Sequence, residues 1–403
     1  MSHQYAVIVV GGGIVGATAA CALAQAGIQV ALVDARKPEK EWDAGSVDMR
    51  VSALTRASQN ILRNVGAWDE MAQRSVGAYQ HMHVWDADSA GVLHFDAADT
   101  EFPELGHIVE NRVTVAALWN QLEALESATI FCPAKVADVQ NNEQGVQVSL
   151  SDGQILNADL VIAADGRDSA LRAMQGIQTT GWEYKQDGLV ATISSEKSHQ
   201  ATAWQRFLPE GPLAFLPLEK GQCSIVWTLS HQTAEEYVAL SDEDFLVRLE
   251  QASGGVLGKM LSVGTRGAFP LRFQYAKQYT SERFALIGDA AHAMHPLAGQ
   301  GANAGLLDAA AIAELLIKAA QAGRPLGSQK VLRQYERWRK GDNLAMMSSM
   351  DVINKMYTSQ YEAVRQIRGS GMSWVNHSAI VKNYFNRYAM GLRADLPEMA
   401  NGV

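Results

Sequence analysis

Three glycines near the start of the chain have the spacing of a phosphate-binding turn. Gly11, Gly13 and Gly16 follow the β-branched run Ala6–Val10 and precede a segment rich in alanine and leucine. Between a strand and a helix, the first glycine permits a tight turn, the second lets a pyrophosphate approach, and the third allows close helix packing. Asp34 ends the next strand-like run, where a carboxylate can accept hydrogen bonds from an adenosine ribose. These residues predict a dinucleotide site, but they do not separate FAD from NAD.

Two further motifs carry an aspartate directly after a strand-like run. Asp165 and Gly166 follow one such run, and Gly288 and Asp289 follow another. A loop with proline and glycine comes after Asp289, and an alanine-rich helix is predicted from about residue 303. For Asp165 and Gly166 alone, an ordinary turn after a strand is the alternative reading.

The histidines and cysteines do not have metal-site spacing. His292 and His295 flank a proline loop and have no further ligands nearby in the sequence. Cys21, Cys132 and Cys223 are far apart and predict neither a zinc site nor a disulfide framework. We therefore predict no metal, and a reducing cytoplasm fits the free thiols.

The segments around these motifs predict an α/β fold: a Rossmann-like nucleotide-binding domain, an inserted antiparallel β-sheet substrate domain and a C-terminal helical segment. Alternating strand patterns dominate two blocks, which we interpret as one sheet assembled from two insertions. The predicted boundaries are 1–77, 103–178 and 268–340 for the nucleotide-binding domain, 78–102 and 179–267 for the substrate domain, and 341–403 for the helical region.

Composition limits the classes of function. The chain has 403 residues, 47% hydrophobic and 19% charged, which is typical of a globular α/β protein. Its net charge of -9 argues against nucleic-acid binding. The apolar stretch Tyr5–Val10 lacks a basic lead-in and is unlike a signal peptide. Since no run approaches the roughly 20 apolar residues of a membrane span, we expect a cytoplasmic protein whose membrane contact, if any, is peripheral on the inner membrane.

The three motifs, in this order, resemble those of the p-hydroxybenzoate hydroxylase type, the class A flavoprotein monooxygenases. The resemblance implies non-covalent FAD, with Asp289 on the ribityl chain and Asp165 serving both FAD and pyridine-nucleotide binding. It also implies that the loop and helix start lie against the flavin, through Pro296, Gly299, Gly301, Ala302 and Asn303. The sequence has no second Gly-x-Gly-x-x-Gly unit, which fits NAD(P)H as a transient reductant.

A narrower resemblance, to the ubiquinone-biosynthesis hydroxylases, is carried by Asp48-Met-Arg50, by 106–111 and by the loop 295–301. It runs over nearly the whole chain and weakens after about residue 348. It implies that Arg50 lies beside the flavin. It also implies that Arg112 lies near the adenosine part of FAD, although a solvated charge on a helix face is an equal alternative.

The reaction implied by the resemblance is ring hydroxylation with NAD(P)H and O2 through a C4a-hydroperoxyflavin, with a prenylated phenol as the substrate. The backbone of Pro296 and the side chain of His295 are the candidate catalytic groups. Phe215, Pro217 and Trp227 are candidate walls of the substrate pocket, and core packing is their alternative.

The sequence leaves two rival functions open. The rivals are a hydroxylase of a soluble aromatic acid and a non-catalytic FAD-bearing subunit of a biosynthetic complex.

In the C-terminal region, an apolar stripe recurs at helical spacing and predicts packing on the chain's own core, on a membrane surface or on a partner, a homo-oligomer included. The stripe comprises Ile380, Val381, Tyr384, Phe385 and Tyr388.

Overall fold

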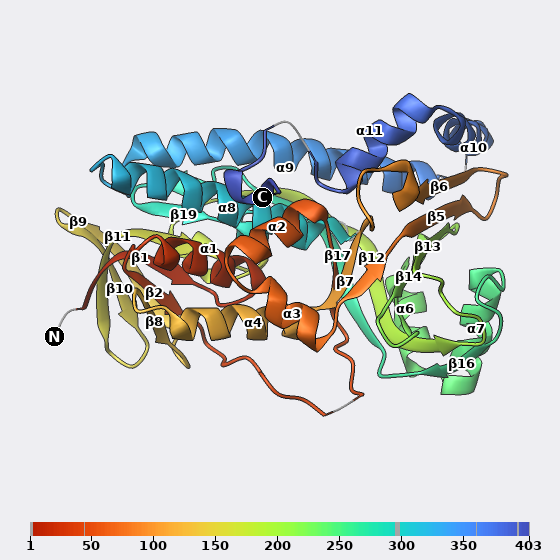
Figure 1. Cartoon of the computed structure of the whole chain (residues 1–403), viewed down its shortest axis with the longest axis horizontal. Coiled ribbons are helices and arrows are strands. Elements are labelled where there is room, and N and C mark those ends of the chain that lie inside the picture. Colours follow the sequence, from red (N-terminus) through yellow and green to blue (C-terminus); the bar gives the residue numbers. More distant parts are fainter. Residues whose placement is uncertain (1–2, 44, 295–298, 360, 393–394, 403) are drawn as a thin grey trace.

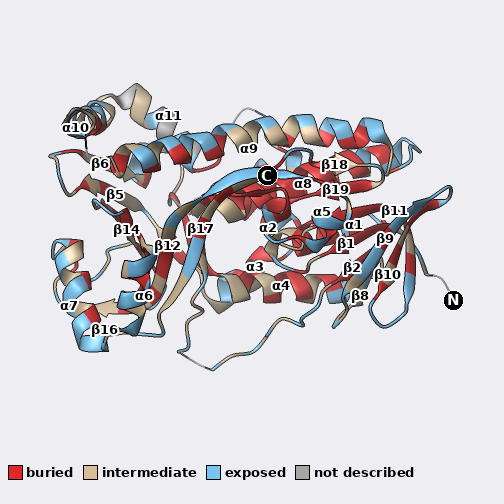
Figure 2. Cartoon of the chain, turned by 180° about the vertical axis from the view of Figure 1, so that it is seen from behind, coloured by how far each residue is buried: buried red, intermediate tan, exposed pale blue. Residues whose placement is uncertain are grey.

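The structure is a computed structural model that describes residues 3–43, 45–294, 299–359, 361–392 and 395–402. Figure 1 shows two sheet regions side by side, with long helices of the C-terminal part running over both. Figure 2 shows that the buried residues are densest around the first sheet and the helices packed on it.

The first sheet is mainly parallel and centres on β1 (His3–Val10). Val7, Ile8 and Val9 are fully buried, as expected for a strand covered on both faces. β1 pairs in parallel with β2 (Val30–Val33) and with β11 (Ile155–Ala163). The other strands of this sheet are β8 (Ala128–Phe131), β9 (Val136–Asn142), β10 (Gly145–Leu150), β18 (Thr280–Ser281) and β19 (Phe284–Leu286).

Helices cover this sheet. α1 (Ile14–Gln25) connects β1 to β2 and packs against α4 (Asn111–Ala124) and α8 (Gln300–Gln321). α9 (Gln329–Tyr357) lies along α8. The shorter helices of this half are α2 (Arg56–Asn64), α3 (Trp68–Arg74) and α5 (Ala170–Met174), and a 3₁₀ turn at Gly288–Ala290 follows β19. The predicted βαβ unit is therefore present.

The second sheet draws most of its strands from the two predicted insertions, but the strands Gly267–Ala276 and His292–Ala293 come almost wholly from the segment 268–340 that was predicted to belong to the nucleotide-binding domain. In hydrogen-bonding order they are β20 (His292–Ala293), β17 (Gly267–Ala276), β12 (Thr179–Ser195), β15 (Cys223–Ser230), β14 (Pro212–Pro217), β13 (Thr202–Phe207), β5 (His81–Asp86) and β6 (Val92–Asp96), with β16 (Met260–Val263) attached to β12. The sheet was predicted to be antiparallel, but β13 and β5 pair in parallel, where the two insertions meet. One face is covered by α6 (His231–Ala239) and α7 (Asp242–Ser253).

A third, small sheet was not predicted. It consists of β3 (Val51–Leu54), β7 (Gly106–Glu110) and β4 (Gly77–Tyr79). Its strands come from segments far apart in the chain and pair antiparallel. This sheet contributes one wall of the cavity described below.

The C-terminal region packs on the second sheet through α10 (Glu362–His377), and α11 (Ala379–Ala389) follows it. Arg368 is 3% exposed and donates two hydrogen bonds to Asp86 of β5, at 2.8 and 2.9 Å. Phe207 of β13 and Tyr357 stack face to face beside this ion pair. The described part of the region thus belongs in part to the chain's own core.

The predicted apolar stripe cannot be placed in the same way. Val381 is half-buried, whereas the side chains of Ile380, Tyr384, Phe385 and Tyr388 lie outside the described residues. Among the residues described, no helix has the length and apolar character needed to cross a bilayer.

Candidate active site

The glycine turn after β1 has the shape that a bound pyrophosphate requires. Gly11 has a φ of +106°, and a Cβ there would overlap the carbonyl of Ala164. A Cβ at Gly16 would overlap the carbonyl of Gly11, so this glycine lets α1 pack closely on the turn. A Cβ at Gly13, in contrast, would meet nothing within 4 Å. The turn is thus tightly packed at Gly11 and Gly16 and has open space beside Gly13.

The N-terminus of α1 faces this turn with its backbone donors free of side-chain caps. Gly13 is the N-cap residue, and the first turn contains no acidic residue. Asp34 accepts the Gly12 N–H at 2.5 Å and the Arg36 N–H at 2.7 Å, and the Trp119 indole donates to the Gly12 carbonyl at 2.7 Å. These contacts hold the turn in place. The positive end of the helix and the open space at Gly13 therefore suit an anionic group.

Asp289 lies in the 3₁₀ turn at the end of β19, and its side chain is accessible to solvent. Although accessible, it is surrounded by protein atoms, and this partial desolvation raises the pKa of its carboxyl group. The positive charges of His292, Arg50 and Arg167 act in the opposite direction. The structure thus brings Arg50 into the electrostatic neighbourhood of Asp289, and its place beside the flavin stays a prediction.

The start of α8 is held by one buried amide. Gly299, the N-cap, has a φ of +62°, and the first turn of α8 contains no acidic residue. The Asn303 amide oxygen accepts hydrogen bonds from the Thr55 N–H at 3.0 Å and the Ser58 hydroxyl at 2.6 Å. Its amide nitrogen donates to the carbonyls of Ala53 at 2.8 Å and Gly299 at 3.1 Å.

Asn303 therefore ties α8 to β3 and α2 with its whole side chain. Only its backbone is left to face a ligand. Gly301 and Ala302 are half-buried, and a Cβ at Gly301 would meet nothing within 4 Å. The positive end of a second helix thus adjoins open space.

Asp308 of α8 is the centre of a buried network that sequence reasoning missed. It accepts hydrogen bonds from the Gly288 N–H, from His292 Nε2 at 2.5 Å, and from Arg339 and Asn343 of α9. Burial by itself would raise the pKa of Asp308, but the charges of His292 and Arg339 outweigh burial and lower it to about 2. The network joins α8 and α9 to the turn that carries Asp289, and it gives His292 a buried partner in Asp308.

A cavity of about 110 Å³ lies between the small sheet and the second sheet. Gly299, the residue that leads into α8, also lines it. The remaining lining residues are Val51, Ala53, Tyr79, Met82, Ile108, Ala203, Trp204, Gln205, Pro212, Ala214, Leu216, Val226 and Thr228. Because Gly299 belongs to both, the cavity adjoins the N-terminus of α8.

Phe215 and Trp227, which were predicted to be walls of the substrate pocket, do not line this cavity. Side chains on a strand alternate between its two faces, and the cavity is lined by their neighbours Ala214, Leu216, Val226 and Thr228. Phe215 and Trp227 instead belong to the core on the other face, where Trp227 contacts Tyr237 of α6 edge-on, at 5.2 Å between ring centroids.

Pro217 is likewise not among the described residues that line this cavity, and its place two residues after Phe215 puts it on that other face. The alternative of core packing therefore holds for Phe215 and Trp227.

The comparisons with known proteins agree with this geometry. The family described as FAD binding domain matches residues 4–348. The chain is 38% identical to ubiquinone hydroxylase UbiL of Rhodospirillum rubrum, over 98% of this chain and 92% of the relative. It is 33% identical to the 3-demethoxyubiquinol 3-hydroxylase of Escherichia coli, over 96% and 98% of the two chains.

The chain belongs to the FAD-binding family. Among solved structures, the p-nitrophenol 4-monooxygenase PnpA of Pseudomonas putida superposes with a TM-score of 0.80 over 98% of this chain and all of the other, at 20% identity. That likeness shows that the two chains share a fold. The chain is an FAD-dependent monooxygenase of the class A fold.

The residues present fit the FAD expected of this family. The open space at Gly13 beside the N-terminus of α1 suits the pyrophosphate, and Asp34 lies at the end of β2 for the ribose. The open space at Gly301 and the uncapped start of α8 suit the flavin ring. Asp289, which precedes the start of α8 in the sequence, is accessible to solvent and can receive the ribityl chain.

Besides Asp34 and Asn303, two more predicted FAD-binding residues are engaged with the chain itself. Asp165 accepts hydrogen bonds from the Ser169 hydroxyl at 2.5 Å and the Leu171 N–H at 3.1 Å, which fixes the start of α5. Its role toward FAD or the pyridine nucleotide stays a prediction.

Arg112 forms an ion pair with Glu110 at 2.7 Å, also contacts Ser46, and stacks on Trp42. Its side chain is 16% exposed, so it is not the solvated helix-face charge considered as an alternative. His295 and Pro296, the candidate catalytic groups, lie outside the described residues.

Proposed function

We propose that this monooxygenase uses NAD(P)H and O2 to hydroxylate the ring of a lipophilic, prenylated phenol in ubiquinone biosynthesis. The observation that carries the substrate class is the lining of the cavity. Among the described residues that line it there is no charged side chain, and most are apolar. A soluble aromatic acid would need a partner for its carboxylate, because an unpaired buried charge is strongly unfavourable. The cavity therefore favours a neutral phenol.

The size of the cavity supports recognition of the ring alone. Its volume is about 110 Å³, and an engineered apolar cavity of about 150 Å³ holds one benzene molecule. A single aromatic ring is thus close to the limit, and a polyprenyl chain has to extend outside. The names of the two relatives above, a ubiquinone hydroxylase and a demethoxyubiquinol hydroxylase, support a substrate of this kind.

The chain's own residues have three tasks in this reaction. Bound FAD, once reduced, supplies the activation of O2. The N-terminus of α8 would hold the flavin ring, and its backbone donors and positive dipole would stabilise negative charge on that ring. The apolar walls exclude water from the ring that reacts.

Tyr79, Gln205 and Thr228 are the side chains in the lining that can hydrogen-bond a phenol oxygen. Desolvation raises the pKa of Tyr79 to about 12, so this residue stays protonated at neutral pH and can donate a hydrogen bond. A donor of this kind can orient the oxygen of a neutral phenol, and with it the ring, in the cavity.

Stopped-flow reduction of the FAD-loaded protein tests the proposal. A short-chain prenylphenol and 4-hydroxybenzoate are compared, with NADH and with NADPH, and the product is analysed after reaction with ¹⁸O₂. We expect the prenylphenol to accelerate flavin reduction and to gain one ¹⁸O atom, and the benzoate to do neither. Acceleration by the benzoate would favour a hydroxylase of soluble acids. No acceleration by either compound would favour a non-catalytic FAD-bearing subunit.

We also propose that the protein takes its substrate at the membrane surface through α10. Tyr361 and Trp374, at the start and on the body of this helix, are 78% and 64% exposed, and exposed aromatic residues suit the membrane interface. Trp374→Ser should reduce sedimentation with liposomes while FAD content and thermal midpoint stay unchanged. Trp182→Ser, which changes an exposed tryptophan on β12, is the matched control. Equal sedimentation of both variants and the wild type would contradict this docking.

A further inference from the structure

We propose that His81, His94 and Asp96 form a binding site for one divalent transition metal ion, and that Zn²⁺ is the ion they suit. The three residues lie on β5 and β6, the antiparallel pair at the edge of the second sheet. They lie on the face opposite the cavity, because Met82, the residue after His81, lines the cavity. The site is therefore separate from the flavin and from the substrate ring.

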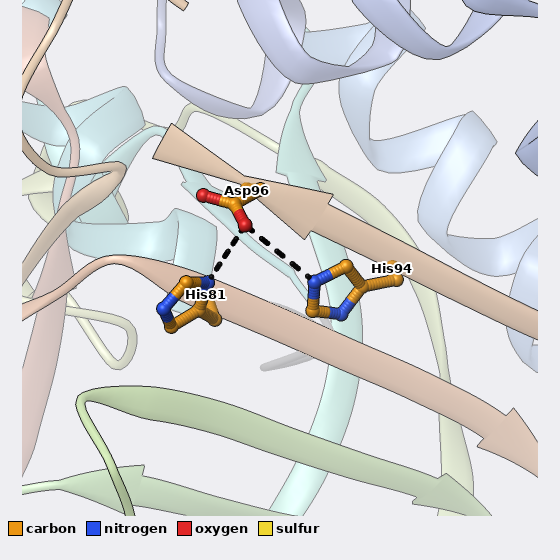
Figure 3. A group of neighbouring side chains, drawn as sticks. All are labelled: His81, His94 and Asp96. Carbon is orange, nitrogen blue, oxygen red and sulfur yellow. Dashed lines mark ion pairs between the residues drawn. The ribbon is translucent and has the colours of Figure 1, made fainter. Parts of the chain in front are cut away.

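The register of the two strands explains why these side chains meet. His81 is directly opposite Asp96, and His94 precedes Asp96 by two residues, so all three point to the same face. Figure 3 shows the Asp96 carboxylate between the two imidazole rings. Asp96 Oδ2 lies 3.2 Å from His81 Nδ1 and 3.9 Å from His94 Nε2. Among the described residues, these form a group whose ligand atoms all lie within 4.8 Å of one another.

These distances are close to those of a bound ion. Tetrahedral Zn²⁺ with ligand bonds of about 2.0–2.2 Å separates its donor atoms by roughly 3.3 Å. The pair His81–Asp96 already has this separation, and His94 Nε2, 3.9 Å from Asp96 Oδ2, has to move closer to the other two donors. Its side chain is 44% exposed and has room to move. The backbone register does not have to change.

One further observation concerns how the ligands are held in place. His81 Nδ1 is enclosed by the protein, and Asp96 Oδ2, 3.2 Å away, is its ion-pair partner, so these two groups already lie at the separation of two metal ligands. Asp96 is oriented through its other oxygen, Oδ1, which accepts the Ala98 N–H at 2.9 Å and leaves Oδ2 available. Such outer contacts are how proteins orient metal ligands.

The donor set selects the class of ion. Two imidazoles and one carboxylate are ligands for Zn²⁺, Cu²⁺ and Ni²⁺, whereas Ca²⁺ and Mg²⁺ require oxygen ligands. Three protein ligands leave at least one position for water. The ion would cross-link β5 to β6, and the backbone N–H of His94 donates to Asn376 Oδ1 of α10 at 3.1 Å. Metal binding is therefore expected to stabilise the edge hairpin on which α10 packs.

The test uses the full-length, FAD-loaded protein, with any affinity tag removed and metals stripped by chelation. Zn²⁺ is titrated by calorimetry, and one equivalent of Cu²⁺ is examined by electron paramagnetic resonance, in which oxidised flavin is silent. We expect one Zn²⁺ per chain with micromolar or tighter affinity, a rise in thermal midpoint on binding, and nitrogen splitting from two imidazoles on Cu²⁺.

Three variants decide the outcome. His94→Gln and Asp96→Asn should each weaken Zn²⁺ binding at least tenfold, and Asp96→Asn keeps an oxygen that can accept the Ala98 N–H. His377→Gln, which changes an exposed histidine on α10, is the matched control and should bind as the wild type does. Should His94→Gln fail to fold, as judged by FAD content, Asp96→Asn carries the test. Wild-type binding that is absent, or equal in all variants, would overturn the proposal without bearing on hydroxylation.

Discussion

Replacing Asn303 by alanine tests whether one buried amide holds the N-terminal end of α8, the end proposed to bind the flavin, in place. Asn303 is 2% exposed, and its amide oxygen is the acceptor for both the Thr55 N–H and the Ser58 hydroxyl. The alanine variant leaves these two buried donors without that acceptor. A stranded buried donor costs about 1–3 kcal/mol, so the two together cost about 2–6 kcal/mol.

The cost should appear mainly as lost FAD affinity. Ala53 and Gly299, which accept hydrogen bonds from the Asn303 amide, line the cavity, and residues 301–303 form the first turn of the helix. If about 1.4 kcal/mol of the cost falls on this region, the dissociation constant of FAD rises tenfold. We therefore expect at least a tenfold rise, measured by titrating the apoprotein with FAD and following the quenching of flavin fluorescence.

Asn60→Ala is the matched control for this experiment. The Asn60 side chain is also a buried amide, but it donates to the carbonyl of Ala400 at 3.0 Å and ties α2 to the C-terminal end of the chain. This variant should have a lower thermal midpoint and a dissociation constant for FAD within twofold of the wild type. The reasoning is refuted if Asn303→Ala binds FAD as well as the wild type while its midpoint falls as far as that of Asn60→Ala.

Three further predictions follow from the site. Asp289→Ala should raise the dissociation constant of FAD by roughly tenfold, because a hydrogen-bond acceptor is lost; unchanged retention on gel filtration would contradict the assignment. Ala214→Leu should lower kcat/KM for the phenol more than tenfold by filling the cavity. Phe215→Leu on the other face should instead reduce the free energy of unfolding by about 1–2 kcal/mol, seen as a lower thermal midpoint, and leave KM unchanged. If Phe215→Leu changed kcat/KM and Ala214→Leu changed only the stability, the assignment of the two faces would be wrong. Since the pKa of Asp308 is lowered to about 2, its contribution to stability is present above about pH 4 and is lost as the pH falls toward 2. Urea unfolding at pH 5 and pH 3 should show that the free energy of unfolding falls less between these pH values in Asp308→Asn than in the wild type.

Much of the nucleotide-binding half could be predicted because its signals are local. The run Ala6–Val10 and the glycines after it predict a strand and a turn, and the structure has β1 at His3–Val10 and α1 from Ile14. The alanine-rich helix predicted from about residue 303 begins at Gln300. The small sheet of β3, β4 and β7 was missed, because its short strands are stable only when they pair across distant parts of the chain.

The network around Asp308 was missed for a related reason. An aspartate inside an alanine-rich helix carries no local sign of its partners, and His292, Arg339 and Asn343 reach it only after α8, α9 and the turn after β19 have packed. Asn303 was predicted to lie at the flavin. Only the packing shows that its side chain makes its hydrogen bonds to β3 and α2.

By itself, the sequence determined that the chain has a dinucleotide turn, an aspartate motif after each of two later strands, and inserted strands that form a second sheet. Only the tertiary structure decided which face of those inserted strands lines the cavity. The alternation of polar and apolar residues along a strand distinguishes its two faces when one face is polar and exposed. β14 and β15 are apolar on both faces, because one face lines the cavity and the other packs in the core with α6 and α7. Leu216 and Phe215 are therefore equally plausible wall residues in the sequence, and packing alone places Leu216 at the cavity.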